Sequence, residues 1–441
     1  MTPSLRRGEP NTERVEAAVD AVAEHARPLS GATLARLAER FADRQFVCIG
    51  EASHGTSEFY RLRARLTKRL LAEYDFSFVA VEGDWTDCHE LNRFVKGVGG
   101  YDDAQSVLSA FDRWPTWLWA NWEVLEFVDW LADCNEGRDE DEQFGFYGMD
   151  VYSLFESMAA VIDYLEDVDP DAAEQARRAY QCFEPYGEDG QTYARETRLV
   201  PEGCEDAVVQ VLRDRQRDRD HDDHHHSDAH FDAEQNALVA KNAEQYYRTL
   251  VRGGADSWNV RDGHMTETLR RLCDHHDGGK GVVWAHNTHV GDARATDMVD
   301  RGEATVGQLL REDFGADDVA LVGLGTNRGS VIAGRQWGAT MEEMAVPTAR
   351  RGSYENVFSR GTTGDSLVYA EDVAETALAD ARGNRAIGVV YHPEREWGNY
   401  VPTVLPDRYD AFCFFDETEA LHPLHSQPAG HLPPEMYPWG V

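Results

Sequence analysis

The sequence predicts an α/β protein with a mostly parallel central sheet flanked by helices. Short, continuous apolar segments of strand length alternate with longer segments of helical periodicity. Strands that are apolar on both faces are typical of a buried, mostly parallel sheet. The chain has 441 residues, of which 42% are hydrophobic. This length and composition indicate a globular protein with a substantial core. The chain is long enough for one large domain or for two domains of average size.

The first elements follow in order from the N-terminal region. FVCIG at residues 46–50 is a short apolar run that fits a buried strand, and residues 56–74 have one apolar face at helical spacing. FVAVEGDW at residues 78–85 is a second apolar run that leads into a loop, and residues 120–135 read as a helix. These segments predict the pattern strand, helix, strand, helix.

The same alternation continues through the middle of the chain. FGFYGMDV at residues 144–151 reads as a third strand, and Ser153 is a good N-cap for a helix that follows it. Residues 237–251 and 264–276 have helical periodicity. Further apolar runs predict the remaining strands, which are residues 281–286, 319–326, 386–391 and 409–415.

This order of elements suggests how the chain is divided. We expect an α/β core made of residues 1–152 and 277–441. The mainly helical residues 153–276 form either an inserted subdomain or part of the outer layer. Within them, residues 213–232 are a low-complexity run rich in Asp, Arg and His, which predicts an exposed, mobile loop.

The strongest global signal is the charge. The formal net charge is −37, from 43 Lys and Arg against 80 Asp and Glu. A surface of this sign repels nucleic acid phosphates and anionic lipids, so neither a nucleic acid nor a membrane is an expected partner. We interpret the charge as adaptation to high salt, where repulsion is screened. An acidic patch for a basic partner is the alternative.

The cellular location is predicted from what the chain lacks. No apolar run approaches the roughly 20 residues that a membrane helix needs, and the N-terminal residues 1–20 lack the apolar segment of a signal peptide. The seven cysteines are scattered without a CxxC pair, which favours reduced thiols. We therefore expect a cytoplasmic protein.

Ionisable side chains follow three of the expected strands. Glu51 and His54 come directly after the first strand, Glu82 ends the second, and His286 and His289 follow the strand GVVWA. Ligands of α/β proteins bind beyond the carboxyl ends of the strands, so these side chains are expected to converge on one pocket. An unpaired buried charge costs several kcal/mol, so they must pair with one another or face solvent in a cleft.

Such a group of side chains suits hydrolysis. An imidazole held by a carboxylate can deprotonate water near neutral pH, and a second imidazole can protonate the leaving group or polarise a carbonyl. A single His at a strand end is usually structural. The expected convergence of the five residues is what favours catalysis.

Two other chemistries use the same residues. Glu and His are also metal-ligand types, which allows metal-assisted hydrolysis, although their spacing does not match the helical HExxH motif. Ser53 next to His54 is a candidate nucleophile, but GEASHG differs from the G-x-S-x-G nucleophile elbow.

Substrate contacts are expected from an aromatic segment at residues 112–127. Trp114 and Trp117 are either core residues or the wall of an apolar or sugar-stacking pocket. Trp122 is expected in the core. The intervening Pro115 suits the first turn of a helix.

A second candidate contact is Arg261, which lies with Asp262 and His264 at a probable helix start. The guanidinium either holds a substrate carbonyl or carboxylate, or forms a structural pair with an inward-facing acid.

Two other features carry weaker predictions. The low-complexity loop holds several histidines that allow loose transition-metal binding, although a solvated insertion is favoured; they are His221, His224, His225, His226 and His230. GLGTNRG at residues 323–329 lacks the spacing of a nucleotide-binding loop and predicts a turn between strands.

Several motifs together resemble the erythromycin esterase family. They are GEASHGTSEFY, VAVEGDW, FYGMDVYSLFESM, WNVRDGHMTETL, WAHNTHVGDARATDM, VGQLLRE and IGVVYHPEREWGNYV. The match looks closest to the subgroup labelled erythromycin esterase-like or succinoglycan-biosynthesis-like. It runs from about residue 30 to about residue 425.

The resemblance implies an α/β core, a helical portion over a deep cleft, and hydrolysis of a macrolide lactone without a required metal, which is an antibiotic-resistance activity. It implies that His54 is the general base and that Glu51 and Glu82 are its carboxylate partners. It also implies that His286 and His289 steady the reacting carbonyl and the leaving oxygen.

We therefore expect a cofactor-free, metal-independent carboxylic ester hydrolase that acts on a small-molecule ester or lactone. Trp114, Trp117 and Arg261 are the expected substrate contacts. The alternatives are a metal-dependent hydrolase and a non-catalytic member that binds a polyketide or a glycan.

Overall fold

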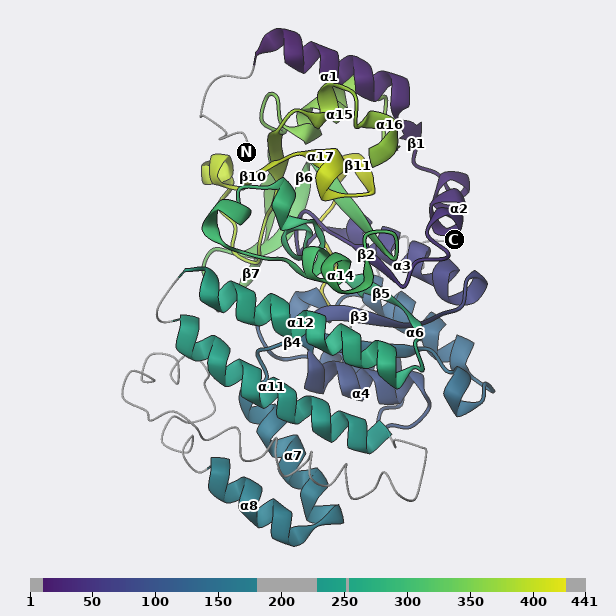
Figure 1. Cartoon of the computed structure of the whole chain (residues 1–441), viewed down its shortest axis with the longest axis vertical. Coiled ribbons are helices and arrows are strands. Elements are labelled where there is room, and N and C mark those ends of the chain that lie inside the picture. Colours follow the sequence, from purple (N-terminus) through teal and green to yellow (C-terminus); the bar gives the residue numbers. More distant parts are fainter. Residues whose placement is uncertain (1–10, 181–227, 251–253, 426–441) are drawn as a thin grey trace. The chain divides into compact units, whose positions relative to one another are not determined.

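The computed structural model describes residues 11–180, 228–250 and 254–425. The chain divides into two compact units (Figure 1). The first unit contains residues 1–79, 93–145 and 280–441, and the second contains residues 80–92 and 146–279. The predicted α/β class and the mostly parallel central sheet are confirmed.

The first unit is built on a sheet whose central strands are parallel. From one edge inward the strands are β1 (Arg27–Pro28), β8 (Ser366–Tyr369), β11 (Ala411–Thr418), β6 (Val319–Gly334), β2 (Phe46–Ile49), β5 (Lys280–Trp284) and the first residues of β3 (Phe76–Asp84). Strand β2 pairs in parallel with β5 and β6, so that Ile49 lies opposite Trp284 and Val322. The carboxyl ends of β2 and β5 therefore lie side by side.

Two antiparallel additions extend this unit. Strand β7 (Met341–Val346) pairs with the second half of β6. Strands β9 (Arg382–Arg385) and β10 (Tyr400–Thr403) form a separate two-stranded sheet.

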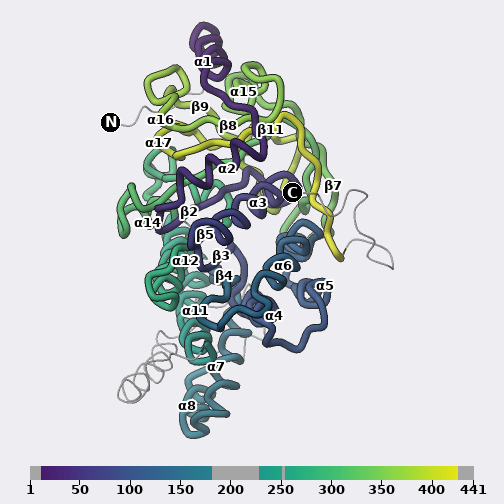
Figure 2. Tube along the Cα trace, turned by 90° about the vertical axis from the view of Figure 1, so that its right-hand side faces the viewer, coloured from purple at the N-terminus to yellow at the C-terminus, as the bar shows by residue number. Residues whose placement is uncertain are grey.

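Helices cover both faces of the first unit's sheet. Figure 2 shows β2 between α3 (Ser57–Glu73) and α14 (Val306–Phe314). The other helices of this unit are α1 (Thr12–His25), α2 (Gly31–Arg40), α5 (Ala104–Ser109), α6 (Trp122–Asn135), α13 (Asn287–Val290), α15 (Tyr354–Gly361), α16 (Ala370–Val373) and α17 (Leu405–Arg408). Short 3₁₀ segments lie at Thr116–Leu118, Glu140–Glu142, Ala293–Ala295, Val299–Arg301, Ala377–Ala379 and Pro393–Gly398.

Helix α3 shows how sequence periodicity produces this packing. Its apolar residues Phe59, Leu62, Leu66 and Leu70 recur at intervals of three and four and are all buried. The helix ends at Glu73, shortly before Asp75, which has a left-handed φ of 57°. The same buried face also carries Arg63, whose side chain is fully buried.

The second unit is mainly helical. It contains the last residues of β3, most of α4 (Trp85–Val95) and most of β4 (Gly145–Asp150), followed by α7 (Leu154–Val168), α8 (Pro170–Tyr180), α11 (Asp228–Leu250) and α12 (Ala255–His275). Helix α11 packs on α7 and α12, and α7 also packs on α8. The core between these helices includes Val161, Leu165, Ala173 and Ala240.

One strand prediction and one turn prediction are wrong. Residues 386–391 form no strand and make only isolated bridges, at Ile387 with Ser53 and at Val390 with Gly334. The motif GLGTNRG at residues 323–329 is not a turn but lies inside β6. Strand β6 continues through it because its partners extend as far, with Thr418 of β11 opposite Gly329.

Some predicted helix boundaries are also corrected. Helix α12 begins at Ala255, so Arg261, Asp262 and His264 lie inside it and not at its start. Residues 228–232 of the expected mobile loop belong to α11, whereas residues 213–227 lie outside the described residues. Pro115 does not begin an α-helix but follows a cis peptide bond and precedes the 3₁₀ segment Thr116–Leu118.

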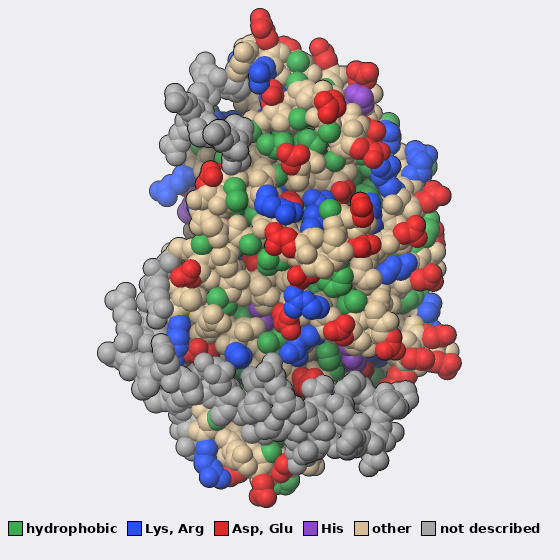
Figure 3. Space-filling model, in the orientation of Figure 1, with side chains coloured by type: hydrophobic (Ala, Val, Ile, Leu, Met, Phe, Trp, Pro, Cys, Tyr) green, Lys and Arg blue, Asp and Glu red, His purple; other side chains and the backbone are tan. Residues whose placement is uncertain are grey.

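Acidic side chains are found over much of the described surface that Figure 3 shows. On the face that Figure 3 shows, Asp and Glu are scattered among Lys and Arg and are not gathered into one patch. Within the described ranges, no helix has both the length and the apolar character needed to cross a membrane.

Gly55 lies in the loop after β2 and is packed directly against β6. A Cβ atom at this position would lie 2.0 Å from the Ile332 carbonyl oxygen and 2.8 Å from two other backbone atoms of Ile332. Gly55→Ala is therefore expected to lower the free energy of unfolding by about 1–3 kcal/mol, because the strand backbone would have to move. Urea unfolding measures the change.

Gly388→Ala is the matched control for this substitution. No heavy atom lies within 4 Å of the added Cβ, and its φ is not positive. We expect a change within about 0.5 kcal/mol. Equal effects of the two substitutions would contradict the close approach at Gly55.

Candidate active site

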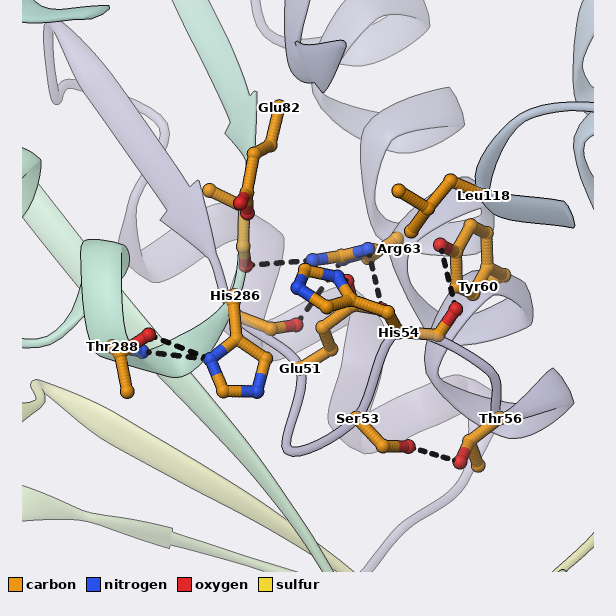
Figure 4. A network of polar contacts seen from close by, with 12 residues as sticks. Glu51, Ser53, His54, Thr56, Tyr60, Arg63, Glu82, Leu118, His286 and Thr288 are labelled. Carbon is orange, nitrogen blue, oxygen red and sulfur yellow. Dashed lines mark hydrogen bonds and ion pairs between the residues drawn. The ribbon is translucent and has the colours of Figure 1, made fainter. Parts of the chain in front are cut away.

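The loop after β2 holds a carboxylate and an imidazole in direct contact. His54 Nδ1 lies 2.8 Å from Glu51 Oε1 (Figure 4). The Glu51 side chain is 2% exposed, whereas that of His54 is 12% exposed. The carboxylate is therefore shielded and the imidazole remains accessible to water. This contact fixes the orientation of the His54 ring through Nδ1.

Glu51 is also paired with a buried arginine that the sequence interpretation missed. The Arg63 guanidinium is fully buried, and its Nη1 lies 2.9 Å from Glu51 Oε2. Its other nitrogens donate to the carbonyls of Gly50 at 3.2 Å and Ala285 at 2.7 Å. Arg63 therefore fixes the carboxylate and joins the ends of β2 and β5.

A signal for Arg63 was present in the sequence. It lies four residues after Phe59 and three before Leu66, on the apolar face of the helix predicted at residues 56–74. A charge at such a position must have a buried partner. Glu51 is that partner.

The end of β5 brings a second imidazole to the first. The rings of His54 and His286 have centroids 4.8 Å apart and are tilted by 38°. His286 Nδ1 accepts a hydrogen bond from the Thr288 backbone N–H at 3.3 Å and lies 2.7 Å from Thr288 Oγ1. Because Nδ1 accepts this bond, the neutral ring carries its hydrogen on Nε2.

His289 lies in the same short helix, α13, and its side chain is buried. Its backbone N–H donates to the His286 carbonyl at 2.9 Å. The structure thus places Glu51, His54, His286 and His289 at the adjoining ends of β2 and β5.

Asn287 fastens the end of β5 to the neighbouring strands. Its side chain donates to the Leu324 carbonyl at 2.6 Å and accepts from the Leu324 N–H at 3.3 Å. Its backbone N–H donates to the Glu51 carbonyl at 2.8 Å. A Cβ on Gly50 would lie 2.0 Å from Asn287 Oδ1, so glycine is required there.

The loop that carries His54 is held on both sides. The Ala52 carbonyl accepts from Ile387 N–H at 2.7 Å, and the Gly55 carbonyl accepts from the N–H groups of Ile332 and Leu421, each at 3.0 Å. The Ser53 hydroxyl is buried and bonded to the Thr56 hydroxyl. This placement is unfavourable for the alternative in which Ser53 acts as a nucleophile.

Glu82 and Arg261 meet within the second unit. Arg261 Nη2 lies 2.6 Å from Glu82 Oε1 and 2.6 Å from Asp150 Oδ2, and its Nε donates to Asp150 Oδ1 at 2.8 Å. The guanidinium also lies over the Tyr152 ring, 5.0 Å from its centroid. Arg261 therefore pairs with inward-facing acids, which is one of the two roles expected for it, and its contact with a substrate stays a prediction.

The two candidate substrate contacts in the aromatic segment, Trp114 and Trp117, differ in burial. Trp117 is fully buried, as is expected of a core residue, and its ring packs edge-on against Trp114 at 5.4 Å. Trp114 is half-buried, and its Nε1 donates to the Ala339 carbonyl at 2.8 Å. Trp114 is therefore the better placed of the two to touch a ligand. Trp122 lies in the core as predicted.

Two buried histidines of the second unit have structural partners. His230 belongs to α11 and lies 2.9 Å from the Tyr164 hydroxyl, while His221, His224, His225 and His226 lie outside the described residues. His264 Nδ1 lies 2.9 Å from the Asn242 amide nitrogen. In the part of the chain that the structure describes, no three His, Cys, Asp or Glu side chains are grouped to hold a metal ion.

The sequence was compared with models of known protein families. The erythromycin esterase model matches residues 71–418, which is most of the chain.

The chain belongs to the erythromycin esterase family.

The matched range includes Glu82, Arg261, His286 and His289 but begins after Glu51 and His54. The roles of these two residues therefore rest on the local geometry.

The relatives of this family member are distant. The erythromycin esterase type II of Escherichia coli is 22% identical over 357 residues, which cover 76% of this chain and 82% of that protein. A solved structure of a succinoglycan biosynthesis protein has a TM-score of 0.75 at 19% identity and covers 93% of this chain and 99% of its own.

Two further solved structures share the fold. A Bacillus cereus protein has a TM-score of 0.73 at 20% identity, over 93% of this chain and 99% of that one. A histidine-to-asparagine mutant of the erythromycin esterase EreC, in its open conformation, has a TM-score of 0.64 at 14% identity, over 89% of this chain and 95% of its own.

Arg63→Met is expected to destabilise the protein strongly, because it leaves the Glu51 carboxylate buried without its cation. The expected loss is about 3–5 kcal/mol of unfolding free energy. The double variant with Glu51→Gln no longer has an unpaired buried carboxylate. It should therefore regain part of the lost unfolding free energy. Denaturant unfolding of both variants checks the expectation.

The same helix offers a matched control in Arg69→Met. Arg69 pairs with Glu73 at 3.1 Å, and the two side chains are 32% and 47% exposed. Its loss should cost less than about 1 kcal/mol. If Arg63→Met cost no more than Arg69→Met, the central role of the buried pair would be refuted.

The second unit is expected to lose stability in acid because of His264. Burial lowers the pKa of His264 from its usual 6.5 to about 4. Between these values the unfolded chain takes up a proton that the folded protein excludes, so stability falls as the pH drops from 6.5 to 4. The loss amounts to about 3 kcal/mol.

Hydrogen exchange of the α12 amides between pH 4 and 7 measures this loss. His264→Gln keeps a polar group beside Asn242 but does not titrate. The stability of this variant should therefore fall less steeply between pH 6.5 and 4 than the stability of the parent protein. Identical slopes would show that another group causes the acid sensitivity.

Proposed function

We propose that this member of the erythromycin esterase family is an ester hydrolase in which His54 is the general base. The observation that carries the proposal is the hydrogen bond between His54 and the buried Glu51, next to the ring of His286. The substrate class is a neutral small-molecule ester or lactone. A net charge of −37 disfavours anionic substrates.

In the first step, His54 Nε2 takes a proton from a water molecule that attacks the ester carbonyl. Glu51 orients the ring through Nδ1 and stabilises the imidazolium that forms. Because Arg63 holds both the Glu51 carboxylate and the backbone of β2 and β5, the dyad is positioned before the substrate arrives.

His286 is proposed to stabilise the negative charge that develops on the carbonyl oxygen of the ester. In its neutral form the ring carries a hydrogen on Nε2, because Thr288 N–H occupies Nδ1. Such a donor can stabilise the oxyanion of the tetrahedral intermediate. His289 follows one helical turn later and is proposed as the second group in this role. The proton that His54 took from water then passes to the leaving oxygen, which returns His54 to its neutral form.

Glu82 is proposed as the second carboxylate partner of the base. Its contact with Arg261 supports an ionised, fixed carboxylate, and Asp150 anchors the same guanidinium. Arg261 is proposed to hold Glu82 in place. Trp114 is proposed to contact the apolar part of the substrate.

His54→Ala is expected to abolish ester hydrolysis while the fold is retained. Removal of a general base lowers kcat by about 10²–10⁴-fold. The assay is a panel of neutral esters and lactones, with a macrolide lactone included, in low and high salt. Circular dichroism and denaturant unfolding confirm that the variant is folded.

His25→Ala is the control, because His25 lies at the end of α1 and outside the proposed site. Its activity should equal that of the parent protein. Near-normal turnover by folded His54→Ala would remove the proposed mechanism.

Elemental analysis of untagged protein with residues 213–227 deleted tests the metal-dependent alternative. A stoichiometric metal that is lost together with activity would favour that alternative.

A further inference from the structure

A tight turn beyond the candidate site presents an exposed tryptophan. Trp337 lies in the turn between β6 and β7 and is 52% exposed. The Ala339 N–H donates to the Gln336 carbonyl at 3.0 Å, and Gly338 has a φ of 75°. A positive φ at the third position of a turn favours glycine, so this sequence fixes Trp337 at the second position.

Trp337 is one half of an indole pair. Its ring centroid lies 4.7 Å from that of Trp114, at an interplanar angle of 55°. The Trp114 ring packs edge-on against Trp117, and its Nε1 donates a hydrogen bond to the Ala339 carbonyl. The Trp114 ring lies close to β6 at Gly334, where a Cβ would lie 3.0 Å from Trp114 Cζ2. The absence of a side chain at Gly334 gives the ring this space. The pair is therefore a rigid, partly exposed aromatic surface.

Strand β6 links the turn that carries Trp337 to the loop that carries His54. The Ile332 N–H of β6 donates to the carbonyl of Gly55, the residue after His54. Trp337 is the fifth residue after Ile332, a span of at most about 18 Å. Gly334 N–H also donates to the Val389 carbonyl at 2.9 Å, in the segment whose Ile387 bonds to Ala52. The turn is thus anchored to the same framework as the proposed base.

We propose that Trp337 is a specificity-determining residue that stacks on a non-reacting ring of the substrate. This inference rests on the proposed ester hydrolase function and adds a class of substrate, namely neutral esters that carry a saturated ring. The apolar face of such a ring packs on an indole surface, and a sugar ring and an aliphatic ring share this chemistry.

The charges around the turn favour an uncharged ring. Arg335 next to the turn is already paired, at 3.3 Å with Glu342 and at 3.9 Å with Glu394. The protein as a whole has a net charge of −37. A carboxylate on the ring would therefore meet acidic side chains without an unpaired cation from Arg335.

The kinetic test compares esters with and without a ring. The probes are a methyl glucoside acetylated at its primary hydroxyl, cyclohexylmethyl acetate, and ethyl acetate, which has no ring. Trp337→Ala should raise KM for at least one of the ring esters by about three- to tenfold with little change in kcat. KM for ethyl acetate should not change. Trp337→Phe should keep most of the preference.

Trp397→Ala is the matched control. Trp397 is another exposed indole of the same unit, at 73% exposure, but Arg350 lies 4.4 Å from its centroid. Its substitution should leave KM for all three esters unchanged. Equal effects of Trp337→Ala on ethyl acetate and on the ring esters would overturn the proposal.

A binding experiment separates this inference from the proposed function. The full-length His54→Ala variant is labelled with 5-fluorotryptophan, and the ¹⁹F resonances are assigned with Trp337→Phe and Trp397→Phe. A ring ester should shift the Trp337 resonance and not that of Trp397. A shift by the glucoside, by the cyclohexyl ester or by both supports the proposal and identifies the ring type.

An unmoved Trp337 resonance with both ring esters would overturn the inference. If the parent protein hydrolysed no ester at all, the proposed function would fail, while the fluorine spectra would still report on ring binding.

Discussion

The buried ion pair between Glu51 and Arg63 is the interaction on which the candidate site depends. Moving two charges out of water is costly, and their mutual attraction offsets the cost only when the ions are close and their other polar atoms have partners. Here the carboxylate meets Arg63 and His54, and the guanidinium also meets two backbone carbonyls. The pair therefore orients the imidazole and holds two strand ends together.

Backbone contacts around the pair explain why the loop after β2 contains small residues. Gly50 and Gly55 lie where a Cβ would meet Asn287 and the backbone of β6. The Asn287 side chain in turn forms hydrogen bonds with both the backbone N–H and the backbone carbonyl of Leu324. The imidazoles of His54 and His286 are thus carried by loops whose positions are set by neighbouring strands and not by the loops themselves.

In the second unit, Arg261 also holds carboxylates in place. This guanidinium joins Glu82, at the end of β3, to Asp150, at the end of β4. An arginine whose planar fork meets several carboxylate oxygens is strongly held. In each unit an arginine on a helix therefore fixes carboxylates near the ends of strands.

The sequence by itself determined the α/β class, most of the strands and the residues at the strand ends. Apolar runs and helical spacing are local signals that depend little on distant residues. The strand expected at residues 386–391 and the turn expected at residues 323–329 failed because pairing partners decide where a strand exists and how far it runs. Tertiary structure alone decided that Arg63 pairs with Glu51, that Trp117 is buried and that Trp337 lies on Trp114. Each of these contacts joins residues brought together by packing, which no local pattern specifies.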